Sequence, residues 1–235
     1  LWQRMYRSEF YHGGPLLMSA ISGIDQALWD IKGKHHDVPV YDLLGGRVRD
    51  RIRVFQWVGG DRPGDVADEA AKLVDAGYDA LKMDATVPLT HVETPDTVQS
   101  VVERVKRVRE EVGQSVDIAL DFRGRVSTAM ADRLLNRLEP LEPLFAEEPV
   151  LPKHESSLPQ LASGTTTPLA SGERRYTRWD YQPLFEDDAV DVIQPNLSHA
   201  GGITETRKIA AMGAALDMAL SPNCPTGPLT LAASL

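Results

Sequence analysis

Three short apolar runs, each closely followed by an acidic residue, decide the fold: Val116-Asp-Ile-Ala-Leu-Asp121, Leu144-Phe-Ala-Glu147 and Pro168-Leu-Ala-Ser-Gly-Glu173. Successive acids in this series are 26 residues apart. A short apolar run is typical of a strand that is buried on both faces, and a 26-residue step leaves room for one helix between strands. The stretch therefore predicts βα units in a parallel sheet.

The same rhythm extends over most of the chain. Seven short apolar runs alternate with stretches of helical period, at 54–58, 80–83, 116–120, 144–146, 168–170, 190–193 and 218–220. Seven units without a linker favour an α/β fold of the (β/α)8 (TIM-type) barrel class. The runner-up is a doubly wound open sheet, which is less favoured because no glycine-rich turn of the dinucleotide-binding type follows a run.

The two ends of the chain indicate a piece of a longer protein. Residue 1 is Leu, and residues 227–235 have the pattern of a helix whose stop signal is not reached. An eighth βα unit is expected after residue 235. Near the start, apolar residues at steps of three and four predict a helix from Pro15 to Lys34.

Composition bounds the class of protein. The 235 residues are 42% hydrophobic and 25% charged, and the net charge is −9, which argues against a nucleic-acid partner. No run approaches the 18 apolar residues of a membrane span and no charged leader opens the chain, so no membrane partner is expected and a cytoplasmic location is the default. Cys224 is the single cysteine of the sequence, so it has no partner for a disulfide within the chain.

The three acids Asp121, Glu147 and Glu173 are candidate metal ligands. The chemistry of a βα barrel takes place at the carboxyl ends of its strands, where equal steps would bring these side chains to one level. Three close carboxylates repel one another unless a cation lies among them, and oxygen ligands suit a hard ion such as Mg²⁺. The alternative is that each acid merely caps a helix or faces solvent in a loop.

Longer motifs resemble the enolase superfamily, in its mandelate racemase branch, and most of all the D-galactonate dehydratases of that branch. The resemblance covers all 235 residues. It is carried by Asp121, by Glu147-Glu-Pro149 and by Gly172-Glu173, and further by the stretches 10–15, 20–34, 39–45, 57–63 and 198–205.

The resemblance implies a fold and an activity. Residues 1–50 would be the end of an N-terminal lid domain, most of which is absent, and residues 51–235 a barrel that lacks its eighth strand. The activity implied is a lyase reaction, the dehydration of a small sugar acid, in a protein that forms homo-oligomers. Mg²⁺ would bind the substrate carboxylate, a base would remove the proton alpha to it, and an acid would help the C3 hydroxyl leave as water.

Three positions depart from the family pattern. Arg123 stands where the family has its acidic His, and Asn196 and Asn223 stand where it has an Asp and the His base that the Asp orients. A guanidinium cannot release a proton and an amide cannot accept one near neutral pH. By strand alternation Arg123 is expected on the side of Asp121, where it would hold substrate oxygens, weaken the metal site, or pair with an acid such as Glu147.

The second strand offers the remaining candidates. Lys82 and Asp84 share one face of that strand, and either would have to be the base if the protein is an enzyme, with Asp84 the better one. Lys82 is otherwise a contact to substrate oxygens or a counter-charge for the metal-site acids. An alternative function is a catalytically inactive or altered relative that binds a metal or a sugar acid, because all three departures fall where protons move.

Overall fold

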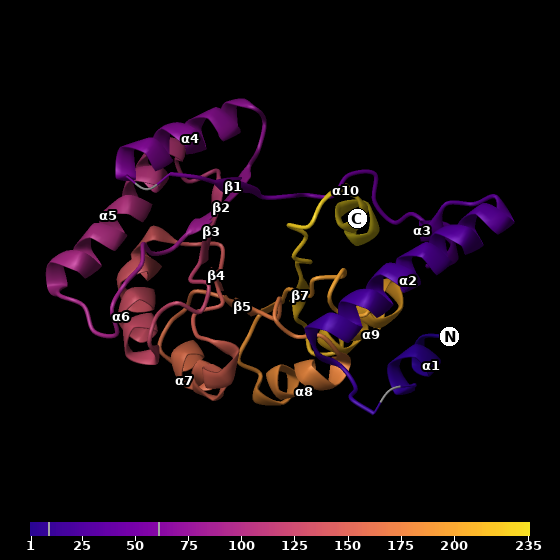
Figure 1. Cartoon of the computed structure of the whole chain (residues 1–235). Coiled ribbons are helices and arrows are strands. Elements are labelled where there is room, and N and C mark those ends of the chain that lie inside the picture. Colours follow the sequence, from indigo (N-terminus) through magenta and orange to yellow (C-terminus); the bar gives the residue numbers. More distant parts are fainter. Residues whose placement is uncertain (9, 61) are drawn as a thin grey trace. The chain divides into compact units, whose positions relative to one another are not determined.

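The chain folds as alternating strands and helices, and the computed structural model describes residues 1–8, 10–60 and 62–235 (Figure 1). The strand order of the sheet follows the sequence, from β1 to β7. Each of the seven predicted runs overlaps one strand, so that prediction is confirmed. The bounds are β1 Gln56–Val58, β2 Ala80–Asp84, β3 Asp117–Asp121, β4 Ala146–Glu147, β5 Leu169–Ser171, β6 Val192–Ile193 and β7 Ala219–Leu220.

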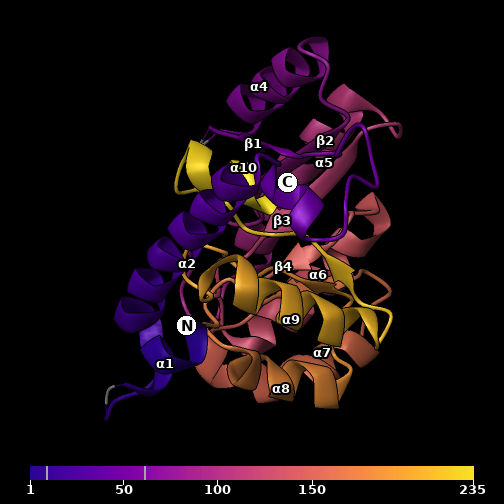
Figure 2. The same ribbon diagram turned by 90° about the vertical axis from the view of Figure 1, so that its right-hand side faces the viewer.

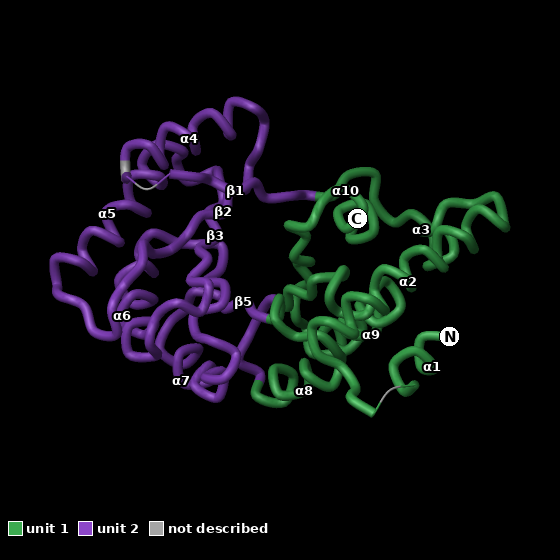
Figure 3. The backbone as a smooth tube through the Cα atoms, in the orientation of Figure 1, with its two compact units in different colours: residues 1–52, 172–187, 193–235 green, residues 53–171, 188–192 purple. Residues whose placement is uncertain are grey.

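Two compact units make up the chain (Figure 3). Unit 1 consists of residues 1–52, 172–187 and 193–235, and unit 2 of residues 53–171 and 188–192. The sheet continues within each unit: Asp191 N–H donates to the Leu169 carbonyl at 2.9 Å in unit 2, and Ser221 N–H donates to the Ile193 carbonyl at 3.0 Å in unit 1. A domain boundary at residue 50 stays a prediction.

Helices connect the strands of unit 2. They are α4 Pro63–Asp75, α5 Pro95–Val112, α6 Thr128–Leu138, η1 Glu139–Leu141, η2 Pro152–Ser157 and α7 Leu158–Ser163. The longest, α5, begins where the Thr94 hydroxyl accepts a hydrogen bond from Thr97 N–H at 3.2 Å, and it ends at Gly113, whose φ of 73° suits glycine. Its valines Val98, Val101, Val105 and Val108, which recur at helical period, are buried.

The register of β2, β3 and β4 brings three acids to one level. Asp84 on β2 is the parallel partner of Asp121 on β3, and Asp121 is the partner of Glu147 on β4. Partners on adjacent strands lie about 4.8 Å apart and their side chains point to the same face. The carboxyl ends of these strands therefore carry a row of three carboxylates.

Arg109 of α5 anchors the opposite end of β3. Its guanidinium donates to the carbonyls of Val116 at 2.6 Å, Gly113 at 2.9 Å, Glu142 at 3.1 Å and Leu141 at 3.2 Å. Burial lowers the pKa of Arg109 from its usual value. These four bonds join the end of α5, the approach to β3 and the turn before β4, so β3 and β4 are held from the side remote from the acids.

Unit 1 is built mainly of helices. They are α1 Trp2–Arg7, α2 Gly14–His36, α3 Val40–Leu43, α8 Arg178–Asp187, α9 Gly202–Ala214 and α10 Pro228–Ser234. The observed α2 confirms the helix predicted from Pro15 to Lys34, with one further residue at the start and two at the end. Helices α2 and α9 lie side by side in both ribbon views (Figures 1 and 2). Within the described part of the chain, no helix has the length and apolarity to span a bilayer.

A buried carboxylate joins α2 to the start of α9. Asp25 is 4% exposed and its Oδ2 accepts a hydrogen bond from Thr204 N–H at 2.9 Å. Gly202 has a φ of 77°, and a Cβ at that position would lie 2.5 Å from Asp25 Oδ2. Only glycine allows this approach, and burial raises the pKa of Asp25 although the bonds from Thr204 oppose the rise.

We expect the free energy of unfolding of the wild type to fall as pH rises from 4 to 7 in part because of Asp25, and we expect Asp25→Asn to make this fall smaller. A carboxyl whose pKa is raised by folding holds its proton more tightly in the folded chain, so its contribution is present at low pH and is lost as pH rises through the folded pKa. Asparagine keeps an acceptor for Thr204 N–H without this titration. Urea unfolding of both proteins at pH 4 and pH 7 tests this, and a wild-type advantage that grows with pH would contradict it.

Candidate active site

The Lys82 ammonium is the counter-charge of Asp121 and Glu147. It bonds Glu147 Oε1 and lies 3.6 Å from Asp121 Oδ2. All three side chains are buried, with Glu147 at 0% exposure. Of the roles that the sequence left open for Lys82, the structure favours charge compensation of the candidate metal ligands. The Lys82 ammonium is therefore already engaged by two carboxylates in this structure.

Arg123 differs from its expected placement. Strand β3 ends at Asp121, and Arg123 lies two residues beyond it with a left-handed φ of 52°, so strand alternation does not apply to it. Its backbone N–H donates to Asp121 Oδ1 at 2.7 Å, while its side chain pairs with Asp84. The expectation of a pairing with a neighbouring acid is thus met by Asp84. The turn after β3 changes which acid the guanidinium reaches.

Trp57 of β1 is a part of this cluster that sequence reasoning did not single out. The Arg123 guanidinium carbon lies 4.6 Å from the centre of its indole ring, and the Lys82 ammonium lies 5.8 Å from it. Trp57 is also the parallel partner of Lys82. A large aromatic residue at a strand end, directly before Val58 and a glycine pair, is the signal that could have identified it. In the motif that contains Trp57, Asp61 is outside the described residues.

Glu173 lies beyond its strand. Strand β5 ends at Ser171, and the parallel partner of Glu147 is Ala170, so Glu173 is three residues past the row of acids. Equal sequence spacing therefore does not place the third acid at the same register. The intervening Gly172 has a φ of 128°, and its carbonyl accepts a hydrogen bond from the Tyr181 hydroxyl at 2.6 Å. A Cβ at Gly172 would lie 2.7 Å from that hydroxyl oxygen, so glycine is needed to bring the chain around to Glu173.

Asn196 and Asn223 contact each other and Glu173. Asn196 Nδ2 donates to Asn223 Oδ1 at 3.1 Å, and Asn223 Nδ2 donates to Glu173 Oε2 at 2.6 Å. Both positions predicted from the family pattern are thus side by side in unit 1. The two amide side chains form hydrogen bonds, but neither can release or accept a proton near neutral pH.

Two further residues from the motifs have partners of their own. Glu148, which follows the second candidate ligand, accepts a hydrogen bond from Ser171 Oγ at 3.3 Å. His199 Nδ1 lies 2.7 Å from Ser19 Oγ. This contact joins the 198–205 motif to α2.

The donor chemistry of the candidate ligands suits a hard divalent cation. Asp121 and Glu147 supply carboxylate oxygens at one level, and they already share one positive charge, the Lys82 ammonium. The fit of this pair to a cation is therefore good. Among the residues that the structure describes, no three His, Cys, Asp or Glu side chains are preassembled as a metal cluster. That Glu173 binds the same metal ion as Asp121 and Glu147 stays a prediction.

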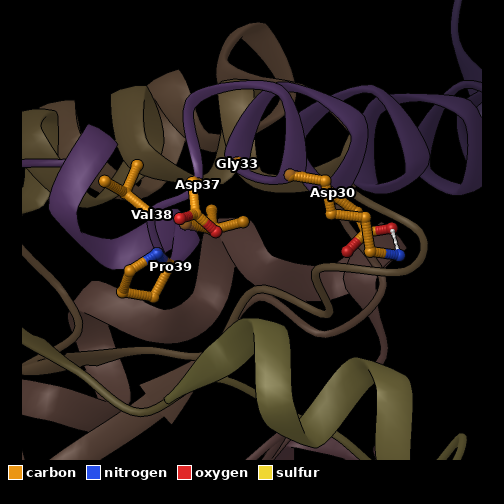
Figure 4. Close-up of a pocket in the computed structure, with 7 residues that line it drawn as sticks. Asp30, Gly33, Asp37, Val38 and Pro39 are labelled. Carbon is orange, nitrogen blue, oxygen red and sulfur yellow. Dashed lines mark hydrogen bonds and ion pairs between the residues drawn. The ribbon is translucent and has the colours of Figure 1, made fainter.

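A pocket in unit 1 lies at the end of α2 and the start of α3 (Figure 4). Asp30, Asp37 and Pro39 are among the residues around it in that view, and Lys34 forms an exposed ion pair with Asp30 at 2.7 Å. None of the candidate catalytic or metal residues lines it. Its lining residues are Asp30, Gly33, Lys34, Asp37, Val38, Pro39 and Val40.

Two protein families match the chain. The family described as enolase C-terminal domain-like matches residues 65–235, and the N-terminal domain family of mandelate racemase / muconate lactonizing enzyme matches residues 1–45. The D-galactonate dehydratase of Variovorax paradoxus (strain S110) is 53% identical over all 235 residues, and that of Ralstonia pickettii (strain 12J) is 52% identical over the same length. The chain spans 62% of the length of each of these relatives.

Solved structures confirm the barrel fold. A member of the enolase superfamily from Salmonella Typhimurium is 34% identical with a TM-score of 0.94, over 100% of this chain and 66% of that one. An enolase from Agrobacterium radiobacter, solved with bound Na and L-malate, is 32% identical with a TM-score of 0.92, over 100% of this chain and 60% of that one. The resemblance that the motifs indicated is confirmed by these matches.

Proposed function

The chain belongs to the enolase superfamily, and its first 45 residues match the N-terminal domain of mandelate racemase / muconate lactonizing enzyme. On this premise we propose that the full-length protein is a Mg²⁺-dependent dehydratase of galactonate-like sugar acids. The reaction removes the proton alpha to a carboxylate and eliminates water, which gives a 2-keto-3-deoxy acid. The two dehydratases that are 52% and 53% identical support this assignment.

The observation that carries the proposal is a pair of carboxylates at one level, Asp121 and Glu147, which both lie against the ammonium of Lys82. A bound Mg²⁺ would supply positive charge for the substrate carboxylate as negative charge develops on it. Asp121, Glu147 and Glu173 would hold that ion. The Agrobacterium radiobacter relative, which binds Na and a dicarboxylate, is consistent with a site for a cation and an organic acid.

Arg123 orients the substrate in this proposal and does not act as an acid. Its guanidinium is held between the Asp84 carboxylate and the face of Trp57. A guanidinium fixed in this way donates several hydrogen bonds in one plane and keeps its proton, so it is suited to bind the hydroxyl or carboxylate oxygens of a sugar acid. Lys82 would share this role once a metal ion compensates the two acids that it now contacts.

The base would come from the second strand, because Asn196 and Asn223 cannot accept a proton. Asp84 is the better candidate, since the Lys82 ammonium is already engaged by the carboxylates of Glu147 and Asp121. Asp84 must first exchange its bond with Arg123 for the substrate. Binding of a substrate oxygen by Arg123 would release the Asp84 carboxylate in the same step.

We expect the full-length protein to bind one Mg²⁺ and Glu147→Gln to weaken that binding by about a hundredfold. Glutamine retains the shape of the side chain but removes the negative charge from a completely buried position. Isothermal calorimetry measures both affinities. The exposed Glu142→Gln is the matched control and should bind like the wild type, whereas equal affinities for all three proteins would refute the ligand assignment.

A substrate screen tests the activity. Purified full-length protein with Mg²⁺ is incubated with a panel of aldonic and aldaric acids, and 2-keto-3-deoxy acids are detected as products. Turnover of a galactonate-like acid that stops when Mg²⁺ is removed would support the proposal. Turnover that is indifferent to Mg²⁺ would contradict its metal dependence.

One observation favours a second function, a non-catalytic relative that binds a metal or a sugar acid. Both positions of the expected His–Asp pair carry amides that bond each other at 3.1 Å. If the screen gives no product while calorimetry still detects a sugar acid or Mg²⁺, the second function holds. The two experiments therefore separate the candidates.

A further inference from the structure

We propose that Asn196 and Asn223 form a polarised hydrogen-bond relay that positions Glu173, and that the relay sets the affinity of the site for a divalent cation. Asn196 and Asn223 are positioning residues in this view, since the residue that would touch the ion is Glu173. The inference rests on the proposed Mg²⁺ site.

The direction of the relay follows from one backbone group. Ser198 N–H can only donate, and it donates to Asn196 Oδ1 at 3.0 Å. The Nδ2 group of Asn196 must then be the donor toward Asn223, whose Oδ1 lies 3.1 Å away. The Nδ2 group of Asn223 is consequently directed at Glu173 Oε2, at 2.6 Å. Each amide can satisfy both of its neighbours in only this orientation.

Burial keeps the relay in this state. Asn196 is 4% exposed, so an inverted amide would set its Nδ2 group against Ser198 N–H with little water available to compensate. The last bond of the relay joins a neutral donor to a carboxylate, which is the stronger type of hydrogen bond. The backbone N–H of Ser198 therefore fixes the orientation of both amides, and the second amide holds the carboxylate of the candidate metal ligand Glu173.

Glu173 depends on such a contact because its backbone lies beyond β5. Strand pairing does not define its side chain, which retains about a third of its exposure, and its Oε1 is 3.9 Å from Arg174 Nε. The bond from Asn223 occupies Oε2 and limits rotation of the carboxylate. Partners of this kind typically change metal affinity by about ten- to a hundredfold when they are removed.

Asn196→Asp is the decisive variant because two explanations predict opposite results. An aspartate at 196 still accepts from Ser198 N–H but can no longer donate to Asn223, so the Asn223 amide turns its Nδ2 group toward Asp and its oxygen toward Glu173. The relay predicts Mg²⁺ binding about tenfold weaker than in the wild type. Electrostatics without the relay predicts tighter binding, since a further negative charge lies near the ion.

Calorimetry with MgCl₂ on the full-length protein measures this, and circular dichroism confirms folding of each variant. Asn223→Leu, which removes the last donor, should weaken binding by a similar factor. The double variant should bind no more weakly than Asn223→Leu alone, because Asn196 acts only through Asn223. Asn136→Asp on the exposed face of α6 adds the same charge elsewhere and should bind like the wild type.

Each outcome decides the proposal. Binding by Asn196→Asp that is equal to or tighter than that of the wild type overturns the relay, and so do losses that add up in the double variant. A wild type that binds no Mg²⁺ overturns the relay together with the metal site of the proposed function. Binding by the wild type that all relay variants retain overturns the relay alone.

Discussion

A triple variant with Asn196→Asp, Asn223→His and Arg123→His is expected to exceed the wild-type dehydratase rate on galactonate-like acids by about a hundredfold or more, assayed at saturating Mg²⁺. A positioned general acid or base typically contributes 10²–10⁴-fold to a rate, and the present amides and guanidinium supply neither. The distance of 3.1 Å between the Asn196 and Asn223 side chains places a histidine at 223 within reach of an aspartate at 196. The aspartate would orient the imidazole and stabilise its protonated form.

The control for this experiment replaces the new histidine at 223 by glutamine and leaves the other two changes in place. Glutamine forms hydrogen bonds without accepting a proton, so the gain should disappear. Product formation from galactonate is measured for each protein. Rapid wild-type turnover that Asn223→Ala abolishes, and that changes at both Lys82 and Asp84 leave intact, would show that proton transfer takes place on the side of Asn223 after all.

Lys82→Met is expected to lower the free energy of unfolding by about 3–5 kcal/mol in the absence of Mg²⁺. Methionine fills a similar volume but removes the positive charge that Glu147 and Asp121 share, and removal of one partner from a buried ion pair is strongly destabilising. Added Mg²⁺ should stabilise the variant more than the wild type, because the ion takes over the role of the ammonium. Urea unfolding with and without MgCl₂ measures both effects.

Lys72→Met is the matched control. Lys72 on α4 is 71% exposed and pairs with Glu69 at 3.3 Å, and exposed pairs contribute about 0–1 kcal/mol. Its loss should therefore change the unfolding free energy little, and Mg²⁺ should stabilise it no more than the wild type. Equal stability of the two variants would mean that Lys82 does not compensate the acids.

The register explains how much of the candidate site was predictable. Asp121 and Glu147 end their strands, and the repeat of 26 residues brought them to one level as expected. The same repeat failed for Glu173, because β5 ends two residues before it and Gly172 turns the chain. Sequence spacing counts residues, whereas register depends on where each strand begins to pair.

The partners of the charged residues were harder to predict. Arg123 pairs with Asp84, although the sequence offered Glu147 as the neighbouring acid. Lys82, which the sequence left with several roles, lies between Glu147 and Asp121. Which acid each cation reaches is set by the left-handed turn at Arg123 and by the place of β2 beside β3, and neither is visible in the order of residues.

The sequence by itself determined the seven strands, the helices that connect them, the family and the amides at positions 196 and 223. These features are local, because apolar period, caps and residue identity act within one element or one motif. Only the tertiary structure decided the place of Asp84 beside Asp121, the placement of Trp57 against Arg123, and the relay from Ser198 to Glu173. These depend on contacts between residues far apart in the chain, where a shift of one residue in pairing changes every partner.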